Sequence, residues 1–203
     1  MTIEQDFIPK GNKNRPGRTN PMRYITLHET GNESVGADAR AHAKYLKTAS
    51  VSWHYTVDSN RAVQHLPDNE DAFHAGDGSG EGNRASIGIE VCVNRDGNLE
   101  QAYRNTAKLC KRLCKKHKIP YENIVFHHKW NGKDCPKHLR RNQPFSFQEF
   151  LALVREDTPS DWAKAAWETA VARGITDGSR PQDAATREEV VCILLRALES
   201  EGK

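Results

Sequence analysis

A short apolar run that ends in two histidines is the feature that most constrains how this chain can fold. Ile124-Val125-Phe126 has the composition of a buried strand, and His127 and His128 follow it directly. Cys135 lies a few residues farther along, beyond a glycine, in a segment expected to be a loop. Thiolate and imidazole are the ligands that zinc prefers in proteins. The sequence therefore predicts that this strand end carries part of a metal site.

A third metal ligand must come from another part of the chain. The best candidate is His28, which closes a second apolar run, Tyr24–Leu27. Successive residues of a strand face opposite sides, so only one of His127 and His128 can reach the ion, and chemistry alone does not decide between them. Three protein ligands would leave a fourth position for water, as in catalytic zinc sites.

Glu90 interrupts the most apolar predicted strand, residues 86–93. A carboxylate inside a buried strand is costly unless it has a partner. That partner would be the water at the metal site, or else an Arg or Lys in a buried ion pair.

Composition limits the class of protein. The 203 residues suffice for one ordinary domain and a small second one. Hydrophobic residues make up 36% of the chain, and no apolar run is long enough to span a bilayer. Residues 1–157 carry a net charge of +5 and residues 158–203 a net charge of −2, an imbalance too mild to predict nucleic-acid binding, although it is compatible with attraction to an anionic cell wall. Five cysteines without paired spacing, and a start without an apolar core, predict free thiols, no signal peptide and synthesis in a reducing cytoplasm.

Strand-like and helical patterns alternate, which predicts an α/β fold with a mixed central sheet flanked by helices. Residues 1–21 are expected to form an irregular lead-in. The expected strands are residues 23–28, 51–58, 61–66, 86–93 and 124–127, the second and third forming a hairpin, and the expected helices are 37–49, 99–117 and 146–156. His42 is expected to pack on its helix rather than bind metal, and Cys110 and Cys114 to lie in the core.

Several motifs follow one another in a recognisable order: a His after the first core strand, a later His followed by Gly-Lys-x-Cys-Pro, and, between them, Trp53-His54-Tyr55 and Ser86-Ile87-Gly88-Ile89-Glu90. Together they resemble the zinc-dependent N-acetylmuramoyl-L-alanine amidases of the phage endolysin and peptidoglycan-recognition type. The resemblance covers roughly residues 20–150. It implies hydrolysis of the amide that joins N-acetylmuramic acid to L-alanine of the peptidoglycan stem peptide.

The resemblance also implies roles for individual residues. The family spacing places the second histidine ligand eight residues before Cys135, which selects His127, so the expected zinc ligands are His28, His127 and Cys135. Glu90 stands at the position of the acid/base glutamate. Lys133 is expected near the metal, where its charge could stabilise the tetrahedral oxyanion.

Two further histidines are expected to contact substrate. His74 lies in a long loop, residues 67–85, and related amidases have a similar histidine loop beside the cleft; the alternative is a surface histidine. His54 belongs to the Trp53-His54-Tyr55 motif. Some relatives have a catalytic tyrosine where this chain has Trp53, and tryptophan has no ionisable hydroxyl to take over that role.

A second region is expected after the amidase domain, so that the domains are residues 1–156 and 157–203. The segment 157–160 resembles a linker, and two helical stretches follow it around residues 161–174 and 186–197. They resemble one S-layer homology repeat, a module that binds secondary cell-wall polysaccharide. Arg180, Asp183, Arg187 and Glu188 would then contact an anionic polysaccharide; the alternative is a helical cap packed on the amidase.

Other functions fit the pattern less well. Non-catalytic peptidoglycan-binding proteins of the same fold typically lack the cysteine ligand, whereas Cys135 is present. A zinc protease would carry a His-Glu-x-x-His motif, which does not occur. We therefore expect a lysin, made in the host cytoplasm without a signal peptide, that acts on peptidoglycan after release; a bacterial recycling amidase would have no use for a wall-binding module.

Overall fold

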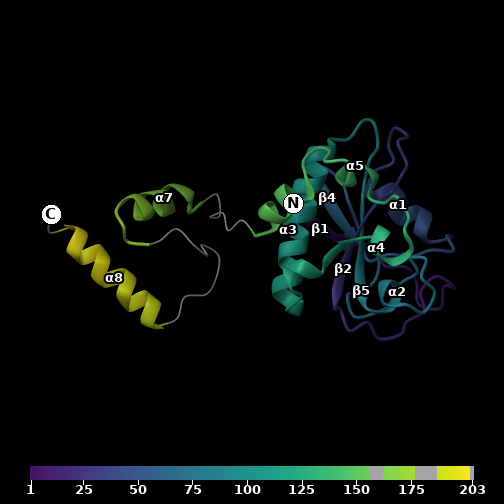
Figure 1. Cartoon of the computed structure of the whole chain (residues 1–203), viewed down its shortest axis with the longest axis horizontal. Coiled ribbons are helices and arrows are strands. Elements are labelled where there is room, and N and C mark those ends of the chain that lie inside the picture. Colours follow the sequence, from purple (N-terminus) through teal and green to yellow (C-terminus); the bar gives the residue numbers. More distant parts are fainter. Residues whose placement is uncertain (156–161, 177–186, 202–203) are drawn as a thin grey trace. The chain divides into compact units, whose positions relative to one another are not determined.

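The computed structural model describes residues 1–155, 162–176 and 187–201 of the chain (Figure 1). The chain divides into two compact units, Met1–Arg155 and Glu156–Lys203. In the described parts, no helix is both long and apolar enough to cross a membrane.

The first unit contains all the strands that the structure describes. Its elements are β1 (Thr2–Gln5), β2 (Tyr24–Glu29), α1 (Ala39–Leu46), β3 (Tyr55–Val57), β4 (Arg61–Gln64), α2 (Glu81–Arg84), β5 (Ser86–Val91), α3 (Leu99–His117), the 3-10 turn η1 (Tyr121–Asn123), β6 (Ile124–Phe126), α4 (His128–Asn131), α5 (Lys137–Arg140) and α6 (Phe147–Arg155).

The strands form one mixed sheet in the order β1-β4-β3-β5-β2-β6. Strands β3 and β4 form the predicted antiparallel hairpin, and the other neighbouring pairs are parallel. The prediction of a mixed α/β fold is therefore confirmed. Because β5, β2 and β6 run in parallel, their carboxyl ends meet at one edge of the sheet. His28 and Glu90 lie at the ends of β2 and β5, and His127 follows β6 directly.

Two expectations for irregular segments were wrong. Thr2–Gln5, expected to belong to an irregular lead-in, pairs with β4 in parallel as an edge strand. Its four residues are too few for a periodic pattern to distinguish them from a loop, and pairing with β4 decides their conformation. The segment after His127, expected to be a loop, contains two short helices, α4 and α5. Gly132 ends α4 at a positive φ of 79°, a conformation that favours glycine.

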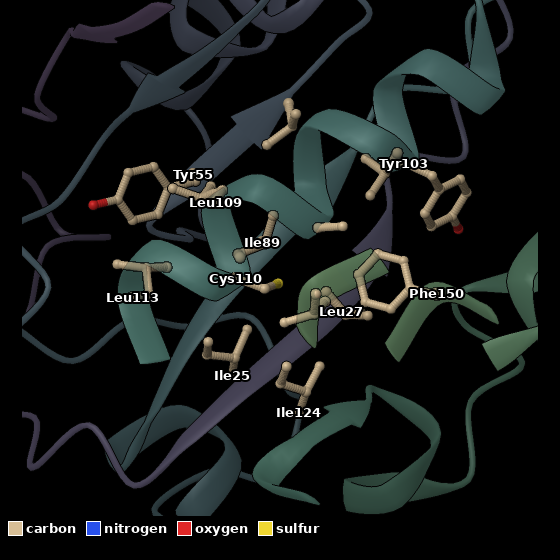
Figure 2. Packing of buried hydrophobic residues seen from close by; sticks show 14 of the residues in the cluster. Ile25, Leu27, Tyr55, Ile89, Tyr103, Leu109, Cys110, Leu113, Ile124 and Phe150 are labelled. Atoms are coloured by element: carbon tan, nitrogen blue, oxygen red, sulfur yellow. The ribbon is translucent and has the colours of Figure 1, made fainter. Parts of the chain in front are cut away.

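The main core lies between the sheet and helices α3 and α6. Figure 2 shows strand residues such as Ile25 and Leu27 meeting Leu109 and Cys110 of α3, with Phe150 of α6 closing the layer. All five side chains are fully buried, or nearly so. Burial of each large apolar side chain stabilises the fold by roughly 1.5–3 kcal/mol. Cys114 is also buried in this core, as predicted together with Cys110.

Helix α1 covers the other face of the sheet, so α1 and α3 lie on opposite sides of it (Figure 1). Asp38 caps the start of the helix, because its side chain accepts a hydrogen bond from the Ala41 amide. Its small residues Ala39 and Ala43 pack against Val63 of β4, which allows a close approach. Other residues of α1, among them His42 and Tyr45, border a cleft.

The second unit contains the helices α7 (Lys164–Ala172) and α8 (Arg187–Glu201) within its described residues. Helix α8 continues beyond the predicted end at residue 197. Its apolar side chains Val191, Leu194, Leu195 and Leu198 are more than half exposed. The predicted linker 157–160 and the residues Arg180 and Asp183 lie outside the described residues.

Candidate active site and metal centre

Three buried side chains converge at the carboxyl edge of the parallel strands. They are His28 of β2, His127 after β6, and Cys135 between α4 and α5, and their ligand atoms all lie within 4.8 Å of one another. The two Nδ1 atoms of His28 and His127 are 2.9 Å apart, and Cys135 Sγ lies 4.0 Å from His28 Nδ1. The structure therefore brings together the three side chains predicted to bind zinc.

The backbone explains why His127 rather than His128 joins this cluster. The amide of His127 donates a hydrogen bond to the Leu27 carbonyl, which extends the pairing of β6 with β2 by one residue. His128 begins helix α4 and is exposed.

Hydrogen bonds behind the cluster determine which ring nitrogens face it. His127 Nε2 lies 2.9 Å from the carbonyl oxygen of Ala75, so it must carry the proton and leave a lone pair on Nδ1. His28 Nε2 lies 2.9 Å from His74 Nδ1, and His74 Nε2 lies 3.4 Å from Ser86 Oγ. The Ser86 hydroxyl donates to the carbonyl of Gly82 at 2.7 Å.

This chain of hydrogen bonds assigns the tautomer of His28. Because the only hydroxyl hydrogen of Ser86 goes to Gly82, His74 Nε2 is the donor to Ser86 Oγ, and His74 Nδ1 is an acceptor. His28 Nε2 then donates to His74, and a lone pair remains on His28 Nδ1. Burial also lowers the pKa of His28, His74 and His127, which keeps all three rings neutral.

The arrangement fits a soft divalent cation such as zinc. Two imidazole lone pairs that oppose each other at 2.9 Å repel unless a cation lies between them. Burial raises the pKa of the Cys135 thiol to about 12, so a nearby cation is needed to hold it as a thiolate. Imidazole and thiolate are ligand types that zinc prefers, and three protein ligands are the number found in catalytic zinc sites.

Glu90 lies directly beside this cluster. It is the register partner of His28 on the adjacent strand, and its Oε1 lies 3.9 Å from His28 Nδ1. Its Oε2 is buried and has no hydrogen-bond partner among the described residues. Burial raises the pKa of the Glu90 carboxyl to about 8, although the charge of Lys133 opposes this rise. Within the described residues no Arg or Lys forms an ion pair with Glu90, so the alternative of a buried ion pair is not observed.

A cleft of about 400 Å³ opens over Glu90. Lys133 and Glu90 both line it, together with residues of the segment after β2, of α1 and of the segment before β3. Lys133 is exposed, and its carbonyl accepts a hydrogen bond from the Cys135 amide at 2.8 Å. Lys133, whose side chain is cationic, therefore lies in the same tight turn as Cys135.

Glu29 anchors the segment that carries Cys135. Its buried carboxylate accepts hydrogen bonds from the Tyr103 hydroxyl on α3 and from both the backbone amide and the ring of His138 on α5. The core helix and the segment after Cys135 are therefore linked through one carboxylate next to His28. The sequence signal for this role was the polar residue directly after a predicted ligand.

The structure places His54 and His74 behind the cluster rather than on the open cleft. His54 is fully buried, its Nε2 hydrogen bonds to the Glu70 carbonyl, and its Nδ1 accepts from the Gly88 amide. Both ring nitrogens are thus engaged within the protein, which corrects the expectation that His54 contacts substrate. His74 is buried as well and bonds to His28, so its placement indicates a positioning residue instead of a substrate contact.

Comparison with known proteins identifies the family. A sequence model of the N-acetylmuramoyl-L-alanine amidases matches residues 18–138. The chain is 53% identical over 141 residues to the amidase XlyA of Bacillus subtilis, an alignment that covers 68% of this chain and 48% of XlyA. It is 51% identical over 163 residues to the amidase CwlH of the same species, covering 78% of this chain and 64% of CwlH. The chain thus spans about half to two thirds of these relatives.

Solved structures agree with this assignment. The catalytic domain of XlyA superposes with a TM-score of 0.72 at 49% identity, covering 76% of this chain and 99% of that domain. PlyL superposes with a TM-score of 0.69 at 31% identity, covering 76% and 97%. With the family pattern matched over more than half of its length, this chain belongs to the N-acetylmuramoyl-L-alanine amidase family.

Proposed function

We propose that this chain is a zinc-dependent lysin that hydrolyses the amide between the lactyl group of N-acetylmuramic acid and L-alanine of the stem peptide. The observation that carries the proposal is the position of Glu90, a carboxyl group at the floor of the cleft and 3.9 Å from a ring nitrogen of the His28–His127–Cys135 cluster. Family membership supports the choice of bond.

The chain's own residues supply the proton transfers. A zinc ion held by His28, His127 and Cys135 would supply Lewis acidity to the scissile carbonyl. Glu90 takes a proton from the water that attacks the carbonyl carbon, and passes it to the nitrogen of L-alanine as the C–N bond breaks. The products are a free lactyl carboxylate and a stem peptide with a new amino terminus. The positive charge of Lys133, and of a metal ion held by the cluster, would lower the pKa of Glu90 and so favour its base form.

Lys133 supplies a second contribution to catalysis, which is stabilisation of the oxyanion. Lys133 lines the same cleft as Glu90. Negative charge develops on the carbonyl oxygen during attack, and a fixed cation in a partly desolvated cleft stabilises it. Lys133→Ala is therefore expected to lower turnover more than substrate binding.

The same residues argue against a non-catalytic peptidoglycan-binding protein. A binding protein has no need for a buried thiol beside two ring lone pairs, nor for a carboxyl group that lines the cleft and whose Oε2 has no hydrogen-bond partner among the described residues. Solubilisation of purified bacterial walls tests this directly. Wild type should release soluble stem peptides, whereas Glu90→Gln should bind walls without releasing them. Equal release by both proteins would refute the proposed role of Glu90.

The second unit extends the proposal to wall binding. We propose that Glu156–Lys203 acts as a module similar to one S-layer homology repeat and binds an anionic secondary cell-wall polysaccharide. The exposed Arg187 and Glu188 at the start of α8 support this, because guanidinium groups can pair with carboxylates through two hydrogen bonds. A chain shortened after residue 156 should adhere less to intact walls but still cleave solubilised peptidoglycan. Equal adhesion of both chains would leave the unit as a structural cap.

The site of action follows from the same proposal. The chain would be made in the host cytoplasm and act on the cell wall after release.

A further inference from the structure

One wall of the cleft is built from helix α1 and the segment before β3, through residues that were not predicted to contact substrate. Its members are His42 and Tyr45 of α1 with Val51 and Trp53. Asn32 stands elsewhere on the rim, and Glu90 and Lys133 line the same cleft. The wall is therefore continuous with the proposed catalytic residues.

An exposed aromatic ring forms the surface of this wall. Tyr45 is 53% exposed and stacks on Trp53 with ring centroids 6.3 Å apart and an angle of 27° between the planes. Trp53 itself is buried, and its indole N–H donates to Thr56 Oγ1 at 2.7 Å. Trp53 thus fixes the Tyr45 ring from behind, while Val51, 38% exposed, extends the apolar surface.

His42 adds a single hydrogen-bond acceptor to the apolar wall. Its Nδ1 lies 2.8 Å from the backbone carbonyl oxygen of Asp38, and a carbonyl can only accept, so Nδ1 carries the proton. Nε2 therefore presents a lone pair, and no described residue donates to it. Burial lowers the pKa of His42, which keeps the ring neutral.

Asn32 provides the complementary donor. Its Oδ1 accepts a hydrogen bond from the Ser34 amide, which orients the side chain and leaves the two Nδ2 hydrogens for a ligand. The cleft thus offers one neutral acceptor, at His42, and one neutral donor, at Asn32. An acetamido group carries the matching N–H and carbonyl.

The charges near this wall favour a sugar over a stem peptide as its ligand. Stem peptides carry carboxylates, which cations would bind. Among the described residues that line the cleft, Lys133 is the one with a cationic side chain, and it does not belong to the α1 wall. Of the basic residues of this region, Arg40 and Lys47 are paired with Glu4 and Asp6, and the exposed Lys44 is not among the residues that line the cleft. A sugar ring, by contrast, presents axial C–H groups that pack against an aromatic face.

We propose that His42, Tyr45 and Asn32 form a subsite for the N-acetylated sugar ring of the muramoyl group. This inference rests on the proposed function, and it adds the part of the substrate that α1 recognises. The lactyl group is short, so a sugar bound at α1 leaves the scissile amide within the same cleft as Glu90.

Two soluble substrates with the same scissile amide test the subsite. One is an N-acetylmuramoyl stem peptide, and the other is the matching D-lactoyl stem peptide, which lacks the sugar. Wild type should prefer the first in kcat/KM. Tyr45→Ala should reduce this preference about 3- to 10-fold, mainly through KM, because the ring contact is lost. Tyr45→Phe should retain most of it.

A second variant and a matched control make the test specific. His42→Phe should reduce the preference by removing the acceptor, whereas His42→Gln, which again offers an acceptor, should restore part of it. Lys44→Ala, an exposed neighbour on α1 outside the cleft, should keep the wild-type preference. Equal losses on both substrates in Tyr45→Ala would assign the wall to the peptide and overturn the proposal.

Binding without catalysis separates this subsite from the proposed reaction. Titration of the Glu90→Gln chain with the peptide-free disaccharide of N-acetylglucosamine and N-acetylmuramic acid should show binding that Tyr45→Ala weakens. No binding by a chain whose parent cleaves the muramoyl peptide would overturn the subsite alone. Absence of cleavage of either substrate by wild type, with disaccharide binding intact, would overturn the proposed function alone.

Discussion

His28 and Glu90 are register partners on adjacent parallel strands, and His28 Nδ1 lies 3.9 Å from Glu90 Oε1. The sheet itself therefore holds a predicted metal ligand and a predicted proton carrier side by side. Their relative position does not depend on a loop, so substitutions at either residue should leave the fold intact and change the chemistry.

Loss of any predicted ligand should remove the metal. His28→Ala, His127→Ala and Cys135→Ser should each reduce bound zinc from about one ion per chain to near zero, because two remaining ligands rarely retain the ion. His128→Ala is the matched control, since His128 is exposed and begins α4. Elemental analysis after dialysis measures this. Zinc loss in His128→Ala with retention in His127→Ala would contradict the assignment.

His74 should control zinc affinity without binding zinc itself. It accepts from His28 Nε2 and so holds the Nδ1 lone pair of His28 toward the cluster. His74→Phe should weaken zinc binding about 10- to 100-fold, as measured by competition with a chromogenic chelator. Gly88→Ala tests the same contact independently, because an added Cβ would lie 2.7 Å from the His74 ring. Unchanged affinity in both variants would mean that the ring only fills space.

Glu90→Gln should separate metal binding from turnover. Glutamine keeps the size of the side chain but cannot carry the proton, so turnover should fall on the order of 10²- to 10⁴-fold. Zinc content and thermal stability should stay near those of wild type. Near-normal turnover would exclude Glu90 as the proton carrier.

Asp68 should contribute to stability as a buried carboxylate that is not among the residues lining the cleft. Its carboxylate accepts hydrogen bonds from Tyr55, Lys116 and His117. Burial raises the pKa of Asp68, but these donors outweigh burial and hold the pKa below its ordinary value. Asp68→Asn should lower the free energy of unfolding at pH 7 by roughly 2–4 kcal/mol.

The same carboxylate predicts a pH dependence. Because the folded carboxyl of Asp68 has the lower pKa, the unfolded chain binds more protons in the acid range. Its stabilisation is complete above about pH 4, the unfolded pKa, and is lost as pH falls through the folded pKa. Denaturant unfolding should therefore show a shallower loss of stability below pH 4 in Asp68→Asn than in wild type. Identical slopes would show that Asp68 is not specifically stabilised as a carboxylate.

Much of this architecture could be predicted from the sequence because its signals are local. Helix α3 has the predicted bounds, Leu99–His117, since an asparagine cap, a long apolar face and a following proline all agree. His28 and His127 could be predicted because each follows an apolar run, and parallel strands bring such positions to one edge. Cys135 could be predicted from its residue type and from its spacing after His127 in the family motif.

The remaining features depend on contacts that the sequence does not show. His54 was predicted in a strand and His74 in a loop, each as a substrate contact. Both are buried instead, and they bond to the backbone carbonyl of Glu70 and to the ring of His28, respectively. His42 has the spacing of a core residue on α1, and only the fold shows that its free nitrogen belongs to a cleft. Pairing with β4 similarly determines that Thr2–Gln5 is a strand.

The most direct test of the central claim is the chemical identity of the ends that the full-length, zinc-loaded chain creates in purified peptidoglycan. Labelling of new amino groups followed by hydrolysis and chromatography should reveal L-alanine as the new amino terminus, with no increase in reducing sugars. L-alanine should not appear with the Glu90→Gln chain. New reducing sugars, or a different amino-terminal residue, would contradict the assignment of this chain as an N-acetylmuramoyl-L-alanine amidase.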